Sequence, residues 1–254
     1  MDTVNPIPGE PAARINLGTE RALAIADYHA GIETAFRYER NVELPSLAAE
    51  RRRRLYDLLD RTDADRLLLL GDLTHSIGEP GGAERGELEV LFEGIDVPVT
   101  LVKGNHDGAI EPFLDADDGP FDSVTVTPTT GVRLGDVGFV HGHTWPSREV
   151  LESSVVCIGH EHPCVRLVDE VGGRRVERVW LRGSLDREPF LAHYDDLAWR
   201  EPELIVFPAF NERCGGTWIN VDGQSFITPF LPAAIAGGEA YLLDGTRLGP
   251  YRDL

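Results

Sequence analysis

The chain has 254 residues, enough for one α/β domain with a full core, and no apolar stretch approaches the roughly 18 residues of a membrane-spanning helix. Its three cysteines include no close Cys-x-x-Cys pair, which excludes a disulfide framework and a zinc knuckle. The formal net charge of −19 is spread along the chain and resembles that of proteins from extreme halophiles, so we interpret it as adaptation to salt rather than as a function.

The first hundred residues alternate short apolar runs with helical patterns. Three of these runs predict buried strands, at residues 22–27, 65–72 and 97–105. Helices are predicted over residues 45–62, where Ser46 can cap the first turn, and over residues 84–95. Because strands that alternate with helices pair in parallel through right-handed crossovers, we expect a parallel sheet in this part of the chain.

Later in the chain the pattern changes to strand-like segments that are separated mainly by turns. These segments cover residues 137–142, 155–160, 164–170, 174–184 and 203–210. Residues 171–173 fit a hairpin turn, and residues 147–153 predict the one helix of this region. We therefore expect an α/β fold: a single domain over residues 1–254, with two sheets, the second more antiparallel, flanked by helices.

Polar side chains follow five of the apolar runs at the point where each run ends. They are Asp27 and His29; Asp72; Asn105, His106 and Asp107; His141 and His143; His160 and His162. Because the carboxyl ends of the strands in an open α/β sheet share one edge, we expect these side chains in one cleft. The alternative is that five turns recruited such residues independently, and the size of the set argues against it.

Carboxylate, amide oxygen and imidazole groups together suit a borderline divalent ion such as manganese, iron or zinc. The set holds too many ligands for one tetrahedral ion, so two ions that share a carboxylate are expected. A pair of ions about 3.5–4 Å apart can clamp the attacking and leaving oxygens of a phosphoryl transfer. The residues therefore predict two-metal phosphoryl chemistry.

In chain order, the motifs DYH, GD, GNHD, HGH and GHEH resemble the five signature motifs of the calcineurin-like metallophosphoesterases, and they span residues 27–162. The segments LGDLTHS (70–76) and VFPAFNERCGGTWIN (206–220) look like those of an archaeal subgroup related to the Mre11/SbcD nucleases, which is similar to bacterial ligase-associated phosphoesterases. The resemblance implies an α/β/β/α sandwich and a metal-dependent phosphoester hydrolase. It leaves open whether the segment 206–220 closes the cleft or completes the second sheet.

The same resemblance implies a site with two divalent metal ions, manganese first, with iron, zinc or nickel as alternatives. It implies seven ligands, with Asp72 shared between the ions: Asp27, His29 and His162 for one ion, and Asn105, His141 and His160 for the other. His106 would lie by the phosphate and protonate the leaving oxygen or stabilise charge. Asp107 would orient His106, as a carboxylate behind a histidine often does.

Two side chains near these motifs have two interpretations each, and a third lies close to a candidate ligand. His75 is expected either beside the site or exposed on a loop, and Trp145 either stacks on a base or packs as an ordinary loop aromatic. His143 lies two residues from His141, but only His141 matches the ligand position of the family.

Three functions are compatible with these residues. The first is a phosphodiesterase or nuclease that acts on DNA or RNA, with a DNA-repair protein as a further partner; the subgroup resemblance implies it, whereas the acidic charge opposes it. The second is a small-molecule phosphatase or nucleotide phosphodiesterase, which the short chain favours. The third is a non-catalytic scaffold, which the complete motif set disfavours. With no basic and apolar leader at the start, we expect a cytoplasmic protein without membrane contact, of open oligomeric state.

Overall fold

The structure is a computed structural model that describes residues 3–115, 119–121 and 123–254. The apolar runs in the first half of the chain form strands of a six-stranded sheet. Its strands, β1 to β6 in spatial order, are Val4–Pro6, Ala12–Asn16, Arg21–Ile25, Arg66–Leu69, Val99–Val102 and Val124–Thr127. The last four are parallel to one another, and β1 and β2 extend the sheet as an antiparallel edge. The expected parallel pairing of the first three predicted strands is confirmed.

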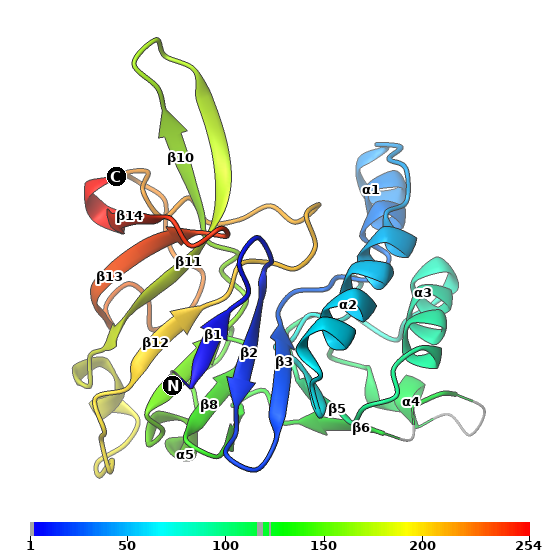
Figure 1. Cartoon of the computed structure of the whole chain (residues 1–254), viewed down its shortest axis with the longest axis horizontal. Coiled ribbons are helices and arrows are strands. Elements are labelled where there is room, and N and C mark those ends of the chain that lie inside the picture. Colours follow the sequence, from blue (N-terminus) through cyan, green and yellow to red (C-terminus); the bar gives the residue numbers. More distant parts are fainter. Residues whose placement is uncertain (1–2, 116–118, 122) are drawn as a thin grey trace.

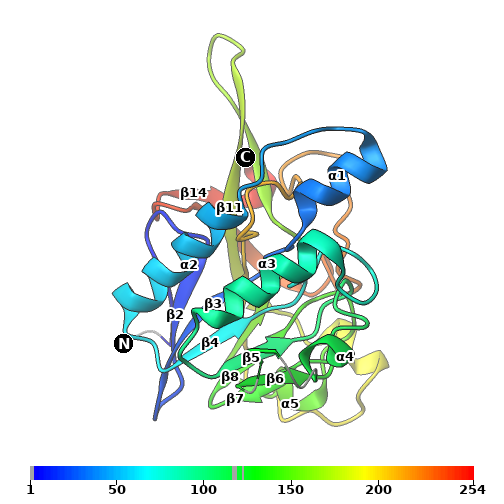
Figure 2. The ribbon, with the colours of Figure 1, turned by 90° about the vertical axis from the view of Figure 1, so that its right-hand side faces the viewer.

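Helices cover the outer face of this sheet (Figures 1 and 2). They are α1, Ile32–Arg40; α2, Ala48–Thr62; α3, Gly82–Glu93; and the short α4, Glu111–Leu114. Leu55 of α2 and Leu88 of α3 are buried in one cluster with Leu67 of β4, because each helix turns its apolar stripe toward the sheet. The predicted cap of α2 differs in detail: Leu47 is the N-cap, and Ser46 only accepts a hydrogen bond from the Ala48 amide at 3.3 Å.

The second sheet has the spatial order β14-β13-β11-β12-β9-β8-β7. These strands are Arg247–Pro250, Ile235–Leu242, Arg174–Leu185, Glu203–Val206, Val155–Ile158, Val137–Val140 and Val132–Leu134. Only β12, β9 and β8 pair in parallel, so the expected antiparallel character is confirmed. β10, Cys164–Val168, pairs with the first part of β11, and this hairpin projects from the body of the protein (Figure 2). The remaining elements are α5 and two 3₁₀ helices: Arg148–Leu151, Glu188–Ala192 and Tyr251–Asp253.

The two sheets pack against each other through small and aromatic side chains. Ala24 and Leu68 of the first sheet share a buried cluster with Phe139, Cys157 and Trp180 of the second. Central parallel strands are buried on both faces, which explains why they are continuous apolar runs. The polar residues that follow β3, β4, β5, β8 and β9 consequently meet at one edge of the sandwich. In the described part of the chain, no helix is both long and apolar enough to cross a bilayer.

Candidate metal centre

The loops that follow five strands bring the candidate metal ligands together around Asp72. Asp72 Oδ2 lies 3.3 Å from His141 Nε2 and 3.7 Å from His29 Nε2. On one side, Asp27 Oδ1 lies 3.0 Å from His162 Nε2. On the other, Asn105 Oδ1 lies 3.2 Å from His141 Nε2. The carboxylate of Asp72 is therefore central to the cluster.

Two groups of potential ligand atoms share this carboxylate. Within each group, all the ligand atoms lie within 4.8 Å of one another: Asp27, His29 and Asp72 in the first, and Asp72, His141 and His160 in the second. This division agrees with the arrangement that the sequence predicts for two ions. His160 also ties the two sheets together, because its backbone amide donates to Asp27 Oδ2 at 3.2 Å.

The backbone at the ligand positions adopts a conformation that L-residues rarely take. Five candidate ligands have a positive φ: Asp27 (58°), His29 (46°), Asp72 (49°), His160 (66°) and His162 (44°). The left-handed region costs an L-residue about 1–2 kcal/mol and persists only where surrounding contacts impose it. Here the loops pair beyond the strands, since the amide of His29 donates to Asp72 O at 2.9 Å.

Glycines before two of the ligands permit close packing of the motifs. A Cβ atom on Gly104 would lie 2.2 Å from Asp72 Oδ1, and one on Gly71 would lie 2.2 Å from His141 Nδ1. No side chain fits at either position. The glycine of GNHD and the glycine of GD are thus required by the approach of a neighbouring ligand.

Backbone carbonyls set the orientation of two candidate ligand rings. His141 Nδ1 lies 2.8 Å from Leu70 O, and His162 Nδ1 lies 2.9 Å from Gly215 O. A carbonyl only accepts hydrogen bonds, so Nδ1 carries the hydrogen and Nε2 faces the carboxylates. His162 Nε2 is buried and makes no well-formed hydrogen bond to any described residue. A metal ion would satisfy this nitrogen, so the residues fit the implied cofactor.

The carboxylates and imidazoles of the cluster also shift one another's pKa. Burial opposes ionisation of Asp72, but His141 and His29 outweigh it and hold the pKa of this carboxyl far below its usual range. Burial lowers the pKa of His141, yet the carboxylates of Asp72 and Asp27 raise it overall, to about 9. Burial lowers the pKa of His29 to about 3, despite Asp72. Burial lowers the pKa of His162, but Asp27 raises it overall, so the two carboxylates favour protons on His162 and His141, and divalent cations bound there would take the place of those protons.

His106 lies at the open side of the cluster. Its backbone amide donates to Asp72 Oδ1 at 2.9 Å, and its Nδ1 hydrogen-bonds to the carbonyl of His75. Its side chain is 24% exposed and its Nε2 lies 3.9 Å from Asp72 Oδ2. A ring held in this way directs Nε2 toward Asp72 and leaves part of the side chain exposed to solvent.

The structure corrects the expected contact of Asp107. This fully buried carboxylate accepts hydrogen bonds from the amides of Leu73, Thr74 and Gly104, at 2.9, 3.1 and 2.9 Å. It therefore joins the GD and GNHD loops, while the ring of His106 is oriented by the His75 carbonyl instead. The physical reason is that two nearby loops present unpaired amides, which a buried carboxylate satisfies.

Residues 20–206 match the model of the Calcineurin-like phosphoesterase family, and this range contains all five motifs. The chain belongs to this family. It is accordingly a metal-dependent phosphoesterase.

The phosphoesterase is similar in fold to solved structures. Pseudomonas putida nuclease MPE aligns with a TM-score of 0.54 and 20% identity, over 96% of this chain and 100% of that chain. A conserved uncharacterized protein from Streptococcus pneumoniae TIGR4, described as a predicted phosphoesterase, aligns with a TM-score of 0.31 and 14% identity, over 90% of this chain and 92% of that chain. The first likeness supports the expected sandwich fold. No curated protein sequence matches the chain.

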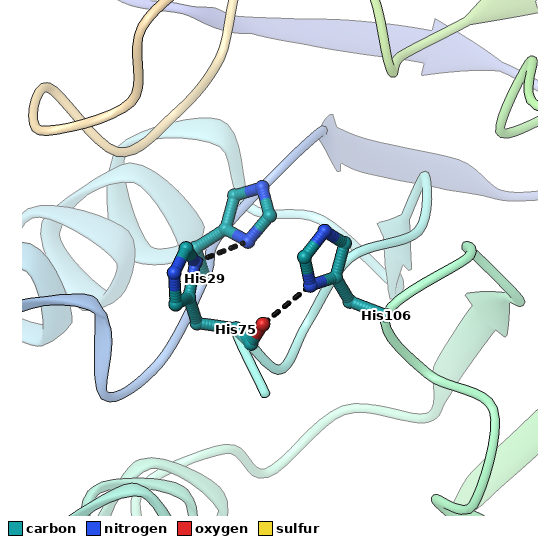
Figure 3. Close-up of side chains that lie close together, drawn as sticks. All are labelled: His29, His75 and His106. Atoms are coloured by element: carbon teal, nitrogen blue, oxygen red, sulfur yellow. Dashed lines mark hydrogen bonds between the residues drawn. The ribbon is translucent and has the colours of Figure 1, made fainter. Parts of the chain in front are cut away.

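Tertiary contacts decide between the interpretations of His75 and Trp145. The rings of His29, His75 and His106 converge (Figure 3), and His75 Nδ1 lies 3.3 Å from His29 Nδ1. His75 therefore lies beside the site of the phosphoesterase. Trp145 packs on His193, with ring centroids 3.8 Å apart, and on Phe190, so it is a packed loop aromatic.

His143 is half-buried beside the second ligand group. Its ring centroid lies 5.4 Å from that of His141 and 6.0 Å from that of His160. Its Nδ1 is buried without a hydrogen bond to any described residue. Burial and the nearby His141 lower the pKa of His143 to about 4, so its ring is neutral at neutral pH.

The segment 206–220 supports the first ligand group and also pairs with β10 beside the second sheet, where Cys164 N donates to Thr217 O at 2.9 Å and Ile219 N donates to Cys164 O at 3.0 Å. Phe210 N donates to Ala26 O at 2.8 Å, and Asn211 N donates to Asp27 O at 3.2 Å. The Asn211 side chain donates to the carbonyls of Tyr28 and His29 at 2.9 and 3.2 Å. Asn211 thus fixes the conformation of the DYH loop. The PAFN motif contains this residue, but the sequence does not show which contacts it makes.

Two further residues near the site carry roles that the sequence patterns did not identify. Glu161 lies between two candidate ligands, and its buried carboxylate accepts from the hydroxyl of Thr217 at 2.8 Å and from the amide of Ile227 at 2.8 Å. Cys214 lies close to His29 and His162. The GHEH motif contains Glu161 and the segment VFPAFNERCGGTWIN contains Cys214, so its position in a quoted motif was a usable signal for each residue.

Proposed function

We propose that this phosphoesterase is a two-metal phosphodiesterase that cleaves DNA or RNA strands. The observation that carries the proposal is the pair of ligand groups that share Asp72. Manganese is the proposed ion, with iron, zinc or nickel as alternatives, because carboxylate, amide and imidazole ligands accept all of them. The proposed ligands are Asp27, His29, Asp72, Asn105, His141, His160 and His162.

Divalent cations bound there would act as Lewis acids on the phosphoryl oxygens and lower the pKa of a bound water. The chain itself contributes orientation and proton transfer. The carbonyl of His75 fixes Nδ1–H of His106, so Nε2 is the atom that can hold a transferable proton. We propose that His106 Nε2 donates this proton to the leaving oxygen as the ester bond breaks.

Asp107 has an indirect part in this proposal. Its carboxylate bonds to amides of the loop that carries His106 and of the loop that carries Asp72. It therefore sets the separation of the proton donor and the shared ligand. We propose a positioning role for Asp107 in place of direct contact with the imidazole.

The nucleic-acid substrate rests on two supports. The sequence resembles nuclease-related phosphoesterases, and the fold is similar to that of a Pseudomonas putida protein described as a nuclease. The net charge of −19 opposes polyanion binding at low salt, and high salt would screen that repulsion. Small-molecule phosphoesters are the second candidate, favoured by the same charge.

The test begins with hydrolysis of bis-p-nitrophenyl phosphate at high salt, after chelation and addition of Mn²⁺. We expect turnover in the wild type that is lost in Asp72→Asn. Single-stranded DNA, RNA, cyclic nucleotides and phosphomonoesters are then compared as substrates. Cleavage of oligonucleotides supports the proposal, and hydrolysis restricted to small phosphoesters favours the second candidate. Absence of all turnover with Mn²⁺, Fe²⁺, Ni²⁺ and Zn²⁺, in folded protein, would refute both.

Three further properties belong to the same proposal. We propose that residues 1–254 act as one domain, which limited proteolysis tests by the survival of a single resistant core. We also propose a cytoplasmic location and a DNA-repair protein as partner. Fractionation and tagged copurification from the native cells test these two points, and a membrane or extracellular fraction would contradict the first of them.

A further inference from the structure

A thiol lies beside the first ligand group. Cys214 Sγ and one ring nitrogen each of His29 and His162 lie within 4.8 Å of one another. Cys214 is a free, half-buried cysteine. The other two cysteines, Cys157 and Cys164, are buried and fall outside the described clusters of potential ligands.

Backbone contacts hold the thiol between the two histidine loops. At one end, the Asn211 side chain donates to His29 O at 3.2 Å, and Cys214 N donates to Asn211 O at 3.3 Å. At the other end, Gly215 O accepts from His162 Nδ1 at 2.9 Å. The segment 211–215 is therefore anchored to both candidate ligands, and Cys214 lies between the anchors. This placement is set by the fold rather than by a mobile side chain.

An independent observation on His162 indicates that a ligand belongs at this position. Its Nε2 is buried and lacks a well-formed hydrogen bond among the described residues. This nitrogen lies 3.0 Å from Asp27 Oδ1 without the alignment of a hydrogen bond, an arrangement that a cation bound to both side chains would satisfy. The thiol belongs to the same cluster of ligand atoms as this ring. Two imidazoles and a thiolate are a ligand set that borderline and soft cations prefer.

We propose that Cys214 is an additional ligand of the ion held by Asp27, His29 and His162, and that it gives this subsite an affinity for thiophilic cations such as Co²⁺, Zn²⁺ and Cd²⁺. The proposal rests on the proposed metal centre and adds a sulfur ligand to it. When Cys214 coordinates, its S–H bond breaks, the proton leaves to solvent, and the sulfur keeps the electron pair that it donates to the cation. No atom is oxidised or reduced.

The test is the absorption spectrum of the metal-free protein titrated with Co²⁺. We expect d–d bands in the visible range together with a sulfur-to-cobalt charge-transfer band in the near ultraviolet. Cys214→Ser and Cys214→Ala should both lose the charge-transfer band and keep the d–d bands. Circular dichroism and thermal melting of each variant establish that it is folded.

Cys164→Ala is the matched control, because Cys164, the first residue of β10, is a second thiol that lies against the segment carrying Cys214. A Cβ on Gly216 would lie 2.8 Å from Cys164 Sγ, yet Cys164 is not part of the ligand group. This variant should keep both sets of bands. Comparing the two variants therefore shows whether loss of the charge-transfer band is specific to Cys214 or follows from the removal of either cysteine.

Each result decides the proposal. Wild-type d–d bands without a charge-transfer band would overturn sulfur coordination and leave the metal centre standing. A charge-transfer band that survives in both Cys214 variants would also overturn it. Absence of Co²⁺ binding in equilibrium dialysis would overturn it too. In that case Mn²⁺-dependent hydrolysis of bis-p-nitrophenyl phosphate by the wild type reports separately whether the proposed function holds.

Discussion

Two buried clusters of charged side chains lie on either side of the DYH loop, and their charges are balanced by different means. In the helical layer, Arg51 lies 3.1 Å from Glu33 and 2.6 Å from Glu87, and all three side chains are at least 94% buried. At the edge of the sheets, Asp27 and Asp72 face imidazoles. The first cluster has a permanent cation of its own, and the second does not.

The difference shows how one short loop serves both structure and chemistry. Tyr28 lies under the guanidinium of Arg51, at 5.3 Å, while its neighbours Asp27 and His29 belong to the ligand cluster. The amide of Gly31, further along the loop, donates to Glu87 Oε2 at 2.9 Å. The helical cluster therefore anchors the loop through charges that are satisfied within the chain. The other cluster remains able to bind cations because its carboxylates face imidazoles, which can give up their protons to a metal ion, whereas Arg51 keeps its charge.

Removing the permanent cation should have the largest effect on stability. Arg51→Met leaves two buried carboxylates without a partner, and we expect the free energy of unfolding to fall by about 3–5 kcal/mol. Urea denaturation measures this change. Arg53→Met, on the exposed side of the same helix, is the control and should change the free energy by less than about 0.5 kcal/mol. Equal effects of the two variants would show that the helical cluster has no special role.

Neutralising the shared carboxylate, Asp72, should reduce activity strongly and change stability little, in contrast to Arg51→Met. Substituting even an outer residue of a metal site costs about 10–100-fold, so we expect Asp72→Asn to reduce hydrolysis of bis-p-nitrophenyl phosphate by at least about 100-fold. Without metal, its free energy of unfolding should change less than that of Arg51→Met, because the buried charge is removed rather than stranded. Asp96→Asn, an exposed carboxylate, is the control. A variant that unfolds as readily as Arg51→Met would contradict the comparison.

Mn²⁺ should stabilise the protein through the Asp27 and Asp72 cluster and not through the helical cluster. Mn²⁺ at about 100 times its dissociation constant should raise the free energy of unfolding by about 2.7 kcal/mol, and chelation should reverse the change. Arg51→Met should show the same increment, since the helical cluster binds no ion. Thermal melting with and without Mn²⁺ measures both. An increment that disappears in Arg51→Met would mean that the two clusters are not independent.

The two clusters should also respond to pH in opposite directions, in metal-free protein. The carboxylates raise the pKa of His141 to about 9 against the effect of burial, so its contribution is complete below its unfolded pKa of about 6.5 and lost as pH rises through 9. Burial opposes ionisation of Glu33, but Arg51 keeps its pKa below the usual value. Its contribution is therefore present above about pH 4.3 and lost as pH falls through the folded pKa.

Urea denaturation across this pH range tests both the loss of stability at acid pH, the acid limb, and the loss at alkaline pH, the alkaline limb. Glu33→Gln should reduce the slope of the loss of stability at acid pH and leave the loss at alkaline pH unchanged, whereas Mn²⁺ should change the loss at alkaline pH. These are the smallest of the expected effects. A stability profile with the same slopes in Glu33→Gln and wild type would sink the assignment of the acid limb to the helical cluster.

The candidate ligands were largely readable from the sequence because each one follows its own strand. A buried strand appears as a continuous apolar run, and parallel strands end at one edge, so local patterns place Asp27, Asp72 and Asn105 near one another. The pairing of β3, β4 and β5 and the mixed second sheet follow from the same signals. Helix α1 was missed although Ile32, Ala35 and Phe36 have helical spacing, because this apolar stripe covers little more than one turn.

Local sequence patterns determined the list of candidate ligands, since a strand and the turn after it lie within one stretch of sequence. Only the tertiary structure decided what holds them. Asn211 bonds to a carbonyl 183 positions earlier, and Asp107 bonds to an amide 34 positions earlier. Cys214 reaches two histidines from a segment that crosses back over the site. Contacts between residues so far apart in the sequence depend on how the two sheets pack. That packing produces no periodic pattern in the sequence of either segment.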